Sequence, residues 1–251
     1  MPAHPEYAIV GNGHWAGVMH GILAQQSKVT IVAGTRRLES ESDSEYQARL
    51  GASLSKAAAK AAWICVPPSP NTLLLAGAAV NSGMHVIAEK PWTWGQPSCQ
   101  SLIGQAQAKG VVVGVHYEYC LLDAVESWLS QQRGGAGLQF RGRFMSSKPD
   151  RLRIPALENL GSHLFAIWAY AVPKAEISTI ACGYRQPDER VVSLTDENRR
   201  VSAIDFTANR EPIIQRFITR FERAFDGGSF PFTLGFASRV WEDLNQFRAK
   251  T

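Results

Sequence analysis

The chain has 251 residues, 45% of them hydrophobic and 19% charged, a composition typical of one large or two modest globular domains. Lysine and arginine exceed aspartate and glutamate by 26 to 22, and this surplus is spread along the chain, so we expect no nucleic-acid partner. No window approaches the roughly 18 apolar residues of a membrane helix and no signal peptide is evident, so we expect a cytoplasmic protein without a membrane partner.

The first half of the chain alternates short apolar runs with helical patterns. We predict strands at 7–10, 28–34, 63–66, 85–89 and 111–119, and helices at 18–25, 71–83 and 96–110. Buried strands that alternate with helices specify a parallel sheet covered on both faces. The prediction is therefore an α/β fold that begins with a doubly wound Rossmann domain at residues 1–119.

The pattern changes near residue 120, where the strands become half-polar and alternating. After a helix at 121–132 and a glycine-rich break at 134–137, we predict antiparallel strands at 138–147, 175–185, 190–196 and 200–208. Further helices are predicted at 158–170, 211–225 and 236–249. Residues 120–251 are therefore predicted to form a smaller α+β domain with a mainly antiparallel sheet, for substrate binding or oligomerisation.

The stretch GNGHWAG follows the first predicted strand. Gly11, Gly13 and Ala16 match GxGxxA, in which the glycines turn the chain, admit a pyrophosphate and let helix and strand pack closely. The motif sits between a strand and a helix, as dinucleotide binding requires, although a purely structural glycine turn is the alternative. His14 belongs to the same loop, and Trp15 either leans over the phosphates or packs inward.

The end of the second predicted strand bears on the choice of cofactor. A carboxylate there binds the ribose 2′-hydroxyl of NAD, whereas arginine and small hydroxyls accept the 2′-phosphate of NADP. This chain has Thr35, Arg36 and Arg37 at that place and no acid before Glu39. The sequence therefore favours NADP over NAD, with a solvated basic loop as the alternative.

Residues 63–94, WICVPPSPNTLLLAGAAVNSGMHVIAEKPWTW, resemble the corresponding segment of the Gfo/Idh/MocA family of NAD(P)-dependent oxidoreductases, which includes glucose-fructose oxidoreductase and inositol dehydrogenase. Glu89, Lys90 and Pro91 match the family's Glu-Lys-Pro signature, the loop at 11–17 is similar to its first loop, and GSHLF at 161–165 is similar to its active-site helix. The similarity covers the first 120 residues closely and the rest loosely, with a shortened C-terminal domain.

The resemblance implies roles for individual residues. Lys90 would hold the reacting oxygen beside the nicotinamide, and His163 would act as general acid or base, although a histidine among apolar residues also fits a core position. Where the family commonly has an aspartate four residues before this histidine, the chain has Asn159, which is neutral. The same resemblance extends the cofactor site to Val66, Pro67, Ser69, Asn71, Glu89 and Lys90, although Ser69 or Asn71 could instead cap the helix that follows. The predicted substrate site comprises Lys90, Asn159, His163 and Tyr117; Tyr117 is included because it ends a strand above the same crevice, although a tyrosine there fits the pocket wall equally well.

These observations predict an enzyme that transfers hydride between a nicotinamide cofactor and a carbonyl or alcohol carbon of a small, sugar-like metabolite. Two alternatives remain. The same fold could reduce a C=N bond with NADPH, or it could be a dinucleotide-binding sensor or assembly protein without catalysis, which Asn159 and the short second domain favour. We expect a homo-oligomer, most simply a dimer, because a small sheet leaves a pocket that a second subunit could close.

The four cysteines are widely spaced, so neither a disulfide framework nor a metal site is expected.

Overall fold

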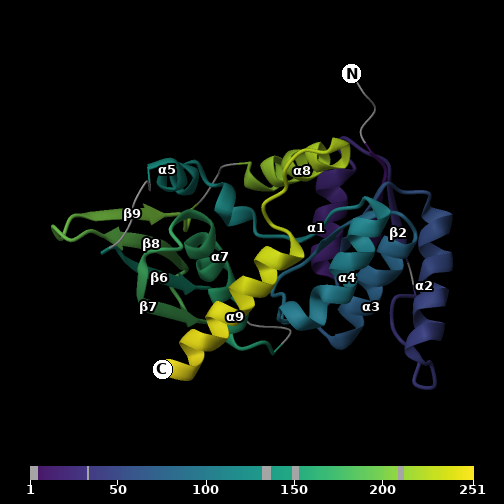
Figure 1. Ribbon diagram of the computed structural model, residues 1–251, viewed down its shortest axis with the longest axis horizontal. Helices are drawn as coiled ribbons and strands as arrows, with labels where there is room; N and C mark the ends of the chain where they lie inside the picture. Colours follow the sequence, from purple (N-terminus) through teal and green to yellow (C-terminus); the bar gives the residue numbers. More distant parts are fainter. Residues whose placement is uncertain (1–4, 33, 132–136, 149–152, 209–211) are drawn as a thin grey trace. The chain divides into compact units, whose positions relative to one another are not determined.

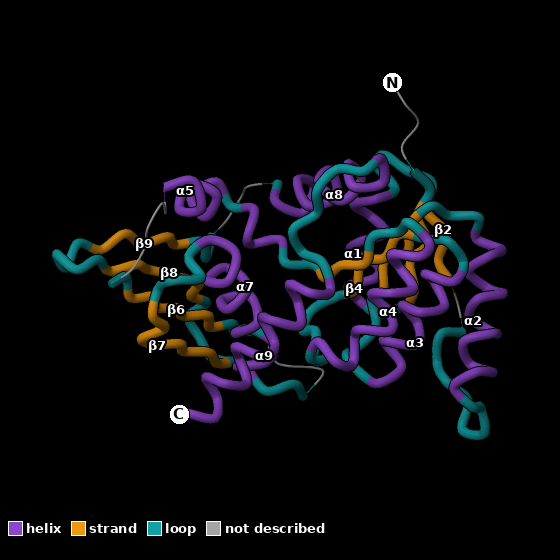
Figure 2. Tube along the Cα trace, in the orientation of Figure 1, coloured by secondary structure: helices purple, strands orange, loops and turns teal. Residues whose placement is uncertain are grey.

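The structure is a computed structural model that describes residues 5–32, 34–131, 137–148, 153–208 and 212–251. Parts of four predicted features lie outside the described residues: residue 33 of the second predicted strand, the glycine-rich break at 134–136, and residues 132 and 211 at two predicted helix ends. The chain forms two compact units, each with its own sheet (Figures 1 and 2). Unit 1 comprises residues 1–116 and 220–239, and unit 2 comprises residues 117–219 and 240–251.

Unit 1 is built on a five-stranded parallel sheet with the order β2-β1-β3-β4-β5. Its strands are β1 (Tyr7–Val10), β2 (Val29–Val32), β3 (Ala61–Ile64), β4 (His85–Ala88) and β5 (Val113–Val115). The order reverses at β1, whose neighbours are β2 and β3. A ligand crevice is expected at such a switch point, outside the carboxyl ends of the strands. The predicted doubly wound parallel sheet is confirmed.

Helices connect these strands and cover both faces of the sheet. They are α1 (His14–Leu23), α2 (Asp43–Ala57), α3 (Pro70–Asn81) and α4 (Gln96–Lys109). Helices α2, α3 and α4 lie side by side (Figure 1). In a right-handed crossover, the direction in which the chain moves along the sheet decides which face the connecting helix covers. The chain moves one way from β1 to β2 and the other way from β3 to β5, so α1 lies on the face opposite these three helices.

Helix α2 was not among the predicted helices. The hydroxyl of Ser42 accepts a hydrogen bond from the amide of Glu45, and the Glu45 carboxylate accepts one from the amide of Ser42. This reciprocal pair is a capping box, which satisfies two amides that a helix start leaves without partners. Tyr46, Leu50 and Leu54 recur at intervals of four and are buried, so the apolar stripe was present in the sequence but narrow.

Residues 220–239 return to unit 1 from the far end of the chain. Tyr7 on β1 donates a hydrogen bond to Glu222 at 2.9 Å, and the amide of Val115 donates to the carbonyl of Phe232 at 2.9 Å. Phe221 and Phe232 are fully buried. The returning segment therefore covers the β5 edge of the sheet, which would otherwise present unpaired backbone groups.

Unit 2 contains a four-stranded sheet with the order β7-β6-β8-β9. Its strands are β6 (Gln139–Met145), β7 (Glu176–Gly183), β8 (Glu189–Thr195) and β9 (Val201–Asp205). The pairs β6–β8 and β8–β9 are antiparallel, as predicted. The prediction was wrong for β7, which runs parallel to β6. The two strands are joined by a helical crossover, and such a connection brings the chain back in the same direction.

The helices of unit 2 include the 3-10 turn η1 (Glu118–Leu121), α5 (Asp123–Gln131), α6 (Ala156–Asn159) and α7 (Gly161–Ala171). Helix α7 packs on β6 and β7. The single helix predicted at 158–170 is wrong, because the chain breaks at Leu160 into α6 and α7. Two last helices, α8 (Ile213–Arg223) and α9 (Leu234–Lys250), each begin in one unit and end in the other.

Candidate active site

The glycine-rich loop lies directly after β1, at the switch point of the sheet. Gly11 is buried and has a φ of 123°, and a Cβ there would lie 2.6 Å from the carbonyl oxygen of Cys65. This position therefore requires glycine, because any side chain would push the loop away from the chain that follows β3. Trp15 takes the inward one of its two predicted placements, with its ring 6.2 Å from the ring of His116.

The start of α1 can accommodate the diphosphate of a dinucleotide. Gly13 is the N-cap residue, and no side chain caps the helix. A Cβ at Gly13 would meet nothing within 4 Å, so the space beside this glycine is open. First-turn amides without a side-chain partner, together with the positive end of the helix dipole, attract anions. The open start of α1 after Gly11 and Gly13 is therefore a place where the diphosphate of a dinucleotide could bind.

The loop after β2 carries the predicted cofactor-selecting residues. Arg36 is exposed, whereas Arg37 is engaged: its guanidinium pairs with Asp43 at 2.6 Å and donates to the carbonyl of Glu41 at 2.7 Å and 3.0 Å. Thr35 is half-buried. Of the two predicted arginines, Arg36 is the one whose charge faces solvent without a partner in the described part of the chain.

Glu89 and Lys90 follow β4, at the carboxyl edge of the sheet. The Glu89 carboxylate points into the protein, where it accepts hydrogen bonds from Trp63 Nε1 at 2.8 Å and from His116 Nδ1 at 3.1 Å. Burial raises the pKa of Glu89, but the charge of His116 and hydrogen bonding from His116, Trp63 and Trp15 outweigh it and hold the pKa below its usual value. Lys90 is half-buried, and its peptide bond to Pro91 is cis.

The loop between β3 and α3 contains the remaining predicted cofactor residues, Val66, Pro67, Ser69 and Asn71. Ser69 is the N-cap residue of α3, and its amide donates to the hydroxyl of Thr72 at 3.2 Å. Thr72 also donates to the carbonyl of Pro67 at 3.3 Å. Ser69 and Thr72 therefore form a capping box at the start of α3, and Asn71 lies half-buried in the first turn of this helix.

In unit 2, His163 on α7 lies in an aromatic setting that the sequence did not indicate. It is 4% exposed, its ring meets the edge of Tyr119 at 4.7 Å between centroids, and it stacks on Phe144 at 5.7 Å. The hydroxyl of Tyr119 accepts a hydrogen bond from Arg190 at 3.0 Å, and the guanidinium lies 5.1 Å from the Phe144 ring. Burial is the main cause of a raised pKa at Tyr119. This phenol therefore stays protonated at neutral pH.

Tyr117 and Asn159 are two of the predicted substrate residues. Tyr117 is 1% exposed, and Tyr119, two residues later, is half-buried and contacts the ring of His163. Asn159 donates from Nδ2 to the hydroxyl of Tyr184 at 2.8 Å. Asn159 is the last residue of α6 and His163 lies in the first turn of α7, with Leu160 between the two helices.

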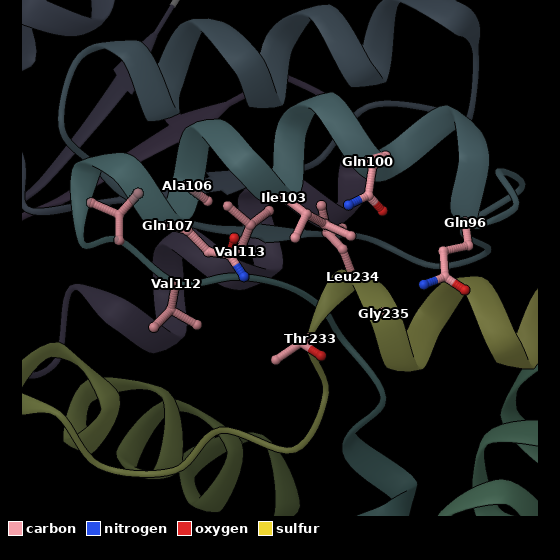
Figure 3. A pocket seen from close by; sticks show the side chains of 11 residues that line it. Gln96, Gln100, Ile103, Ala106, Gln107, Val112, Val113, Thr233, Leu234 and Gly235 are labelled. Carbon is pink, nitrogen blue, oxygen red and sulfur yellow. The ribbon is translucent and has the colours of Figure 1, made fainter.

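A cavity of about 420 Å³ lies along the β5 edge of unit 1, away from the glycine-rich loop after β1. Gln96, Gln100 and Gln107 of α4 line one side, while Val113 and Leu234 supply apolar surface opposite (Figure 3). The described residues that line it include no ionisable side chain. The predicted chemistry therefore does not belong to this cavity.

Within the described residues, no three histidine, cysteine, aspartate or glutamate side chains are grouped so that they could hold a metal ion. The helices of the same residues include none that is long and apolar enough to span a membrane.

Residues 6–117 match the model of the family described as the oxidoreductase family with an NAD-binding Rossmann fold, GFO_IDH_MocA. The resemblance to the Gfo/Idh/MocA family is thereby confirmed for residues 6–117, which make up just under half of the chain and match an NAD-binding Rossmann fold. No curated protein matches the chain.

Solved structures share the fold over nearly the whole length. UDP-N-acetylglucosamine 3-dehydrogenase GnnA from Acidithiobacillus ferrooxidans is 19% identical, with 98% of this chain and 97% of that chain covered and a TM-score of 0.77. GenD2 from gentamicin A biosynthesis, in complex with NAD, is 17% identical, with coverages of 97% and 93% and a TM-score of 0.71. An inositol dehydrogenase homolog from Azotobacter vinelandii, complexed with NADH and myo-inositol, is 14% identical, with coverages of 96% and 93% and a TM-score of 0.67.

Proposed function

We propose that this oxidoreductase transfers hydride between NADP and a carbonyl or alcohol carbon of a small, sugar-like metabolite. One observation carries the proposal: the Gly11–Ala16 loop and Lys90 follow strands of the same parallel sheet and therefore lie at the same carboxyl edge. A bound nicotinamide dinucleotide supplies or accepts the hydride. Two structural neighbours, a sugar-nucleotide dehydrogenase and an inositol dehydrogenase homolog, support a polyhydroxylated substrate.

The roles of the chain's own residues follow from the charge that develops on the reacting oxygen. An ammonium aimed at that oxygen stabilises the alkoxide, so Lys90 polarises the carbonyl or holds the alcohol. His163, which packs against the rings of Tyr119 and Phe144, passes the proton as general acid or base. Gly11, Gly13 and the first amides of α1 bind the diphosphate. Arg36 favours NADP, while the NAD complex of GenD2 supports NAD, so direct competition must decide between them.

Lys90→Ala tests the proposed chemistry. Titration of NADPH and NADH emission establishes whether a dinucleotide binds and which binds more tightly. UDP-N-acetylglucosamine and myo-inositol serve as probe substrates. We expect Lys90→Ala to keep its affinity for the cofactor within about threefold and to lose at least about 100-fold in turnover, because the ammonium acts on developing charge.

Lys109→Ala, at the end of α4, is the matched control and should leave both quantities unchanged. Unchanged turnover in Lys90→Ala would contradict the assigned role. Cofactor binding without turnover of any substrate would favour a sensor.

We also propose that the protein is a homodimer, for which light scattering after gel filtration should give twice the mass of the 27.5 kDa chain.

A further inference from the structure

One arginine of α2 bonds to the backbone of the loop after β2, which carries Arg36. Arg49 donates hydrogen bonds to the backbone carbonyls of Gly34 and Arg36, the second at 3.0 Å. The same guanidinium makes a bidentate pair with Glu41 at 2.7 Å and 2.9 Å. A planar guanidinium has five donors in fixed directions and can make these four hydrogen bonds together, whereas the ammonium of a lysine has only three donors on a single atom.

A tyrosine one turn earlier completes this support. Tyr46 is 1% exposed, and its hydroxyl donates to the carbonyl of Thr35 at 2.6 Å. The Arg49 guanidinium lies 5.4 Å from the centre of the Tyr46 ring, within the range of a cation–π contact. Three consecutive carbonyls, those of residues 34, 35 and 36, are therefore bonded to two side chains of α2.

These contacts also show which charged side chains of the loop are paired within the protein and which one extends into solvent. The hydrogen bond from Arg49 is the main reason that the pKa of Glu41 falls to about 2, so this carboxylate stays ionised and paired. Asp43 is paired with Arg37. The backbone on either side of Arg36 is fixed while its side chain extends into solvent.

We propose that Arg49 is a positioning residue for cofactor selection: it holds the backbone of residues 34–36 so that Arg36 faces the ribose 2′-phosphate of NADP. The proposal rests on the proposed dinucleotide binding. Arg49 itself contacts the loop and Glu41, so it acts through Arg36.

The test is a double-mutant cycle read as the ratio of NADPH to NADH affinity, which needs no substrate. Arg36→Ala should weaken NADPH binding by about tenfold and leave NADH binding within about twofold, because only NADPH carries the additional phosphate. Arg49→Lys should lower the ratio by about fivefold in the wild-type background and leave it unchanged in the Arg36→Ala background. Tyr46→Phe should lower the ratio in the same direction. Arg239→Lys, in the same unit, is the control and should have no effect.

The failures of the two proposals are distinguishable. A wild-type protein that binds neither dinucleotide overturns the proposed function. A protein that binds one or both, but in which Arg49→Lys weakens NADPH and NADH equally, or changes their ratio equally in both backgrounds, overturns the role of Arg49. Circular dichroism melting of each variant checks folding, and if Arg49→Lys does not fold, Tyr46→Phe gives the same decision.

Discussion

Glu89 shows how a single carboxylate can connect three neighbouring elements. It follows β4, and it accepts hydrogen bonds from Trp63 on β3 and from His116, the residue after β5. His116 is 1% exposed and the Glu89 side chain 11%, so both groups have lost most of their water. A buried pair of this kind contributes to specificity of structure more than to net stability, but removing one partner leaves the other without compensation.

Glu89→Gln should therefore destabilise the protein by about 2 kcal/mol, because a neutral amide oxygen is a weaker acceptor for the buried donors of Trp63 and His116 than the carboxylate is. Urea unfolding at pH 7 measures the change. Glu6→Gln removes the exposed pair with Lys28 and should cost less than about 0.5 kcal/mol. Equal effects of the two variants would mean that the Glu89 pair is electrostatically no different from a surface pair.

His85 makes stability depend on pH. It is 6% exposed, stacks on Phe225 at 4.0 Å, and accepts a hydrogen bond at Nδ1 from the amide of Val112 at 3.1 Å. Burial, assisted by the charge of Lys60, lowers the pKa of His85 to about 4. The unfolded chain, with a histidine pKa near 6.5, binds the proton first, so stability falls as the pH decreases from about 6.5 to about 4.

The expected loss from this histidine between pH 7 and pH 5 is about 2 kcal/mol in the free energy of unfolding. His85→Asn keeps an acceptor for the Val112 amide but cannot be protonated. Between pH 7 and pH 5, the free energy of unfolding of this variant should therefore fall by about 2 kcal/mol less than that of the wild type. Urea unfolding at the two pH values checks this, with His20→Asn on α1 as the control. A wild-type curve parallel to that of His85→Asn would show that His85 does not carry the dependence.

At the scale of elements, the sequence was sufficient where the signal is local. The parallel strands of unit 1 are short apolar runs, and the glycines that end β1 and the Glu-Lys-Pro that ends β4 lie next to the strands that position them. Helix α2 was missed because much of its surface is exposed and polar, although Ser42 and Glu45 carry a capping signature.

Contacts between distant segments could not be predicted in the same way. Alternation of apolar and polar residues identified β7, but its direction depends on the helical crossover from β6, which alternation does not encode. Arg49 supports a loop 13 residues away, and Arg190 reaches Tyr119 across 71 residues. Neither arginine belongs to a local motif, so no sequence signal distinguishes the two from the other arginines of the chain.

At the scale of the whole molecule, the chain does not divide at a single point. A boundary was predicted after residue 119, and unit 2 begins at Tyr117, but residues 220–239 come back to complete unit 1. The Rossmann unit therefore includes a segment that follows most of unit 2 in the sequence. Its stability depends on how closely this segment approaches β5.

Gly114 on β5 makes that approach possible. A Cβ at this position would lie 2.4 Å from the ring of Phe230 and 2.5 Å from the carbonyl oxygen of Phe232, which accepts the hydrogen bond from the amide of Val115. Gly114→Ala should therefore force the returning segment outward and destabilise the protein by about 2 to 3 kcal/mol. Gly104→Ala, within α4 where a Cβ meets nothing within 4 Å, should instead stabilise it by about 0.5 to 1 kcal/mol. Urea unfolding of the two glycine variants separates these opposite signs, and a neutral Gly114→Ala would mean that residues 228–235 can move away from β5 without cost.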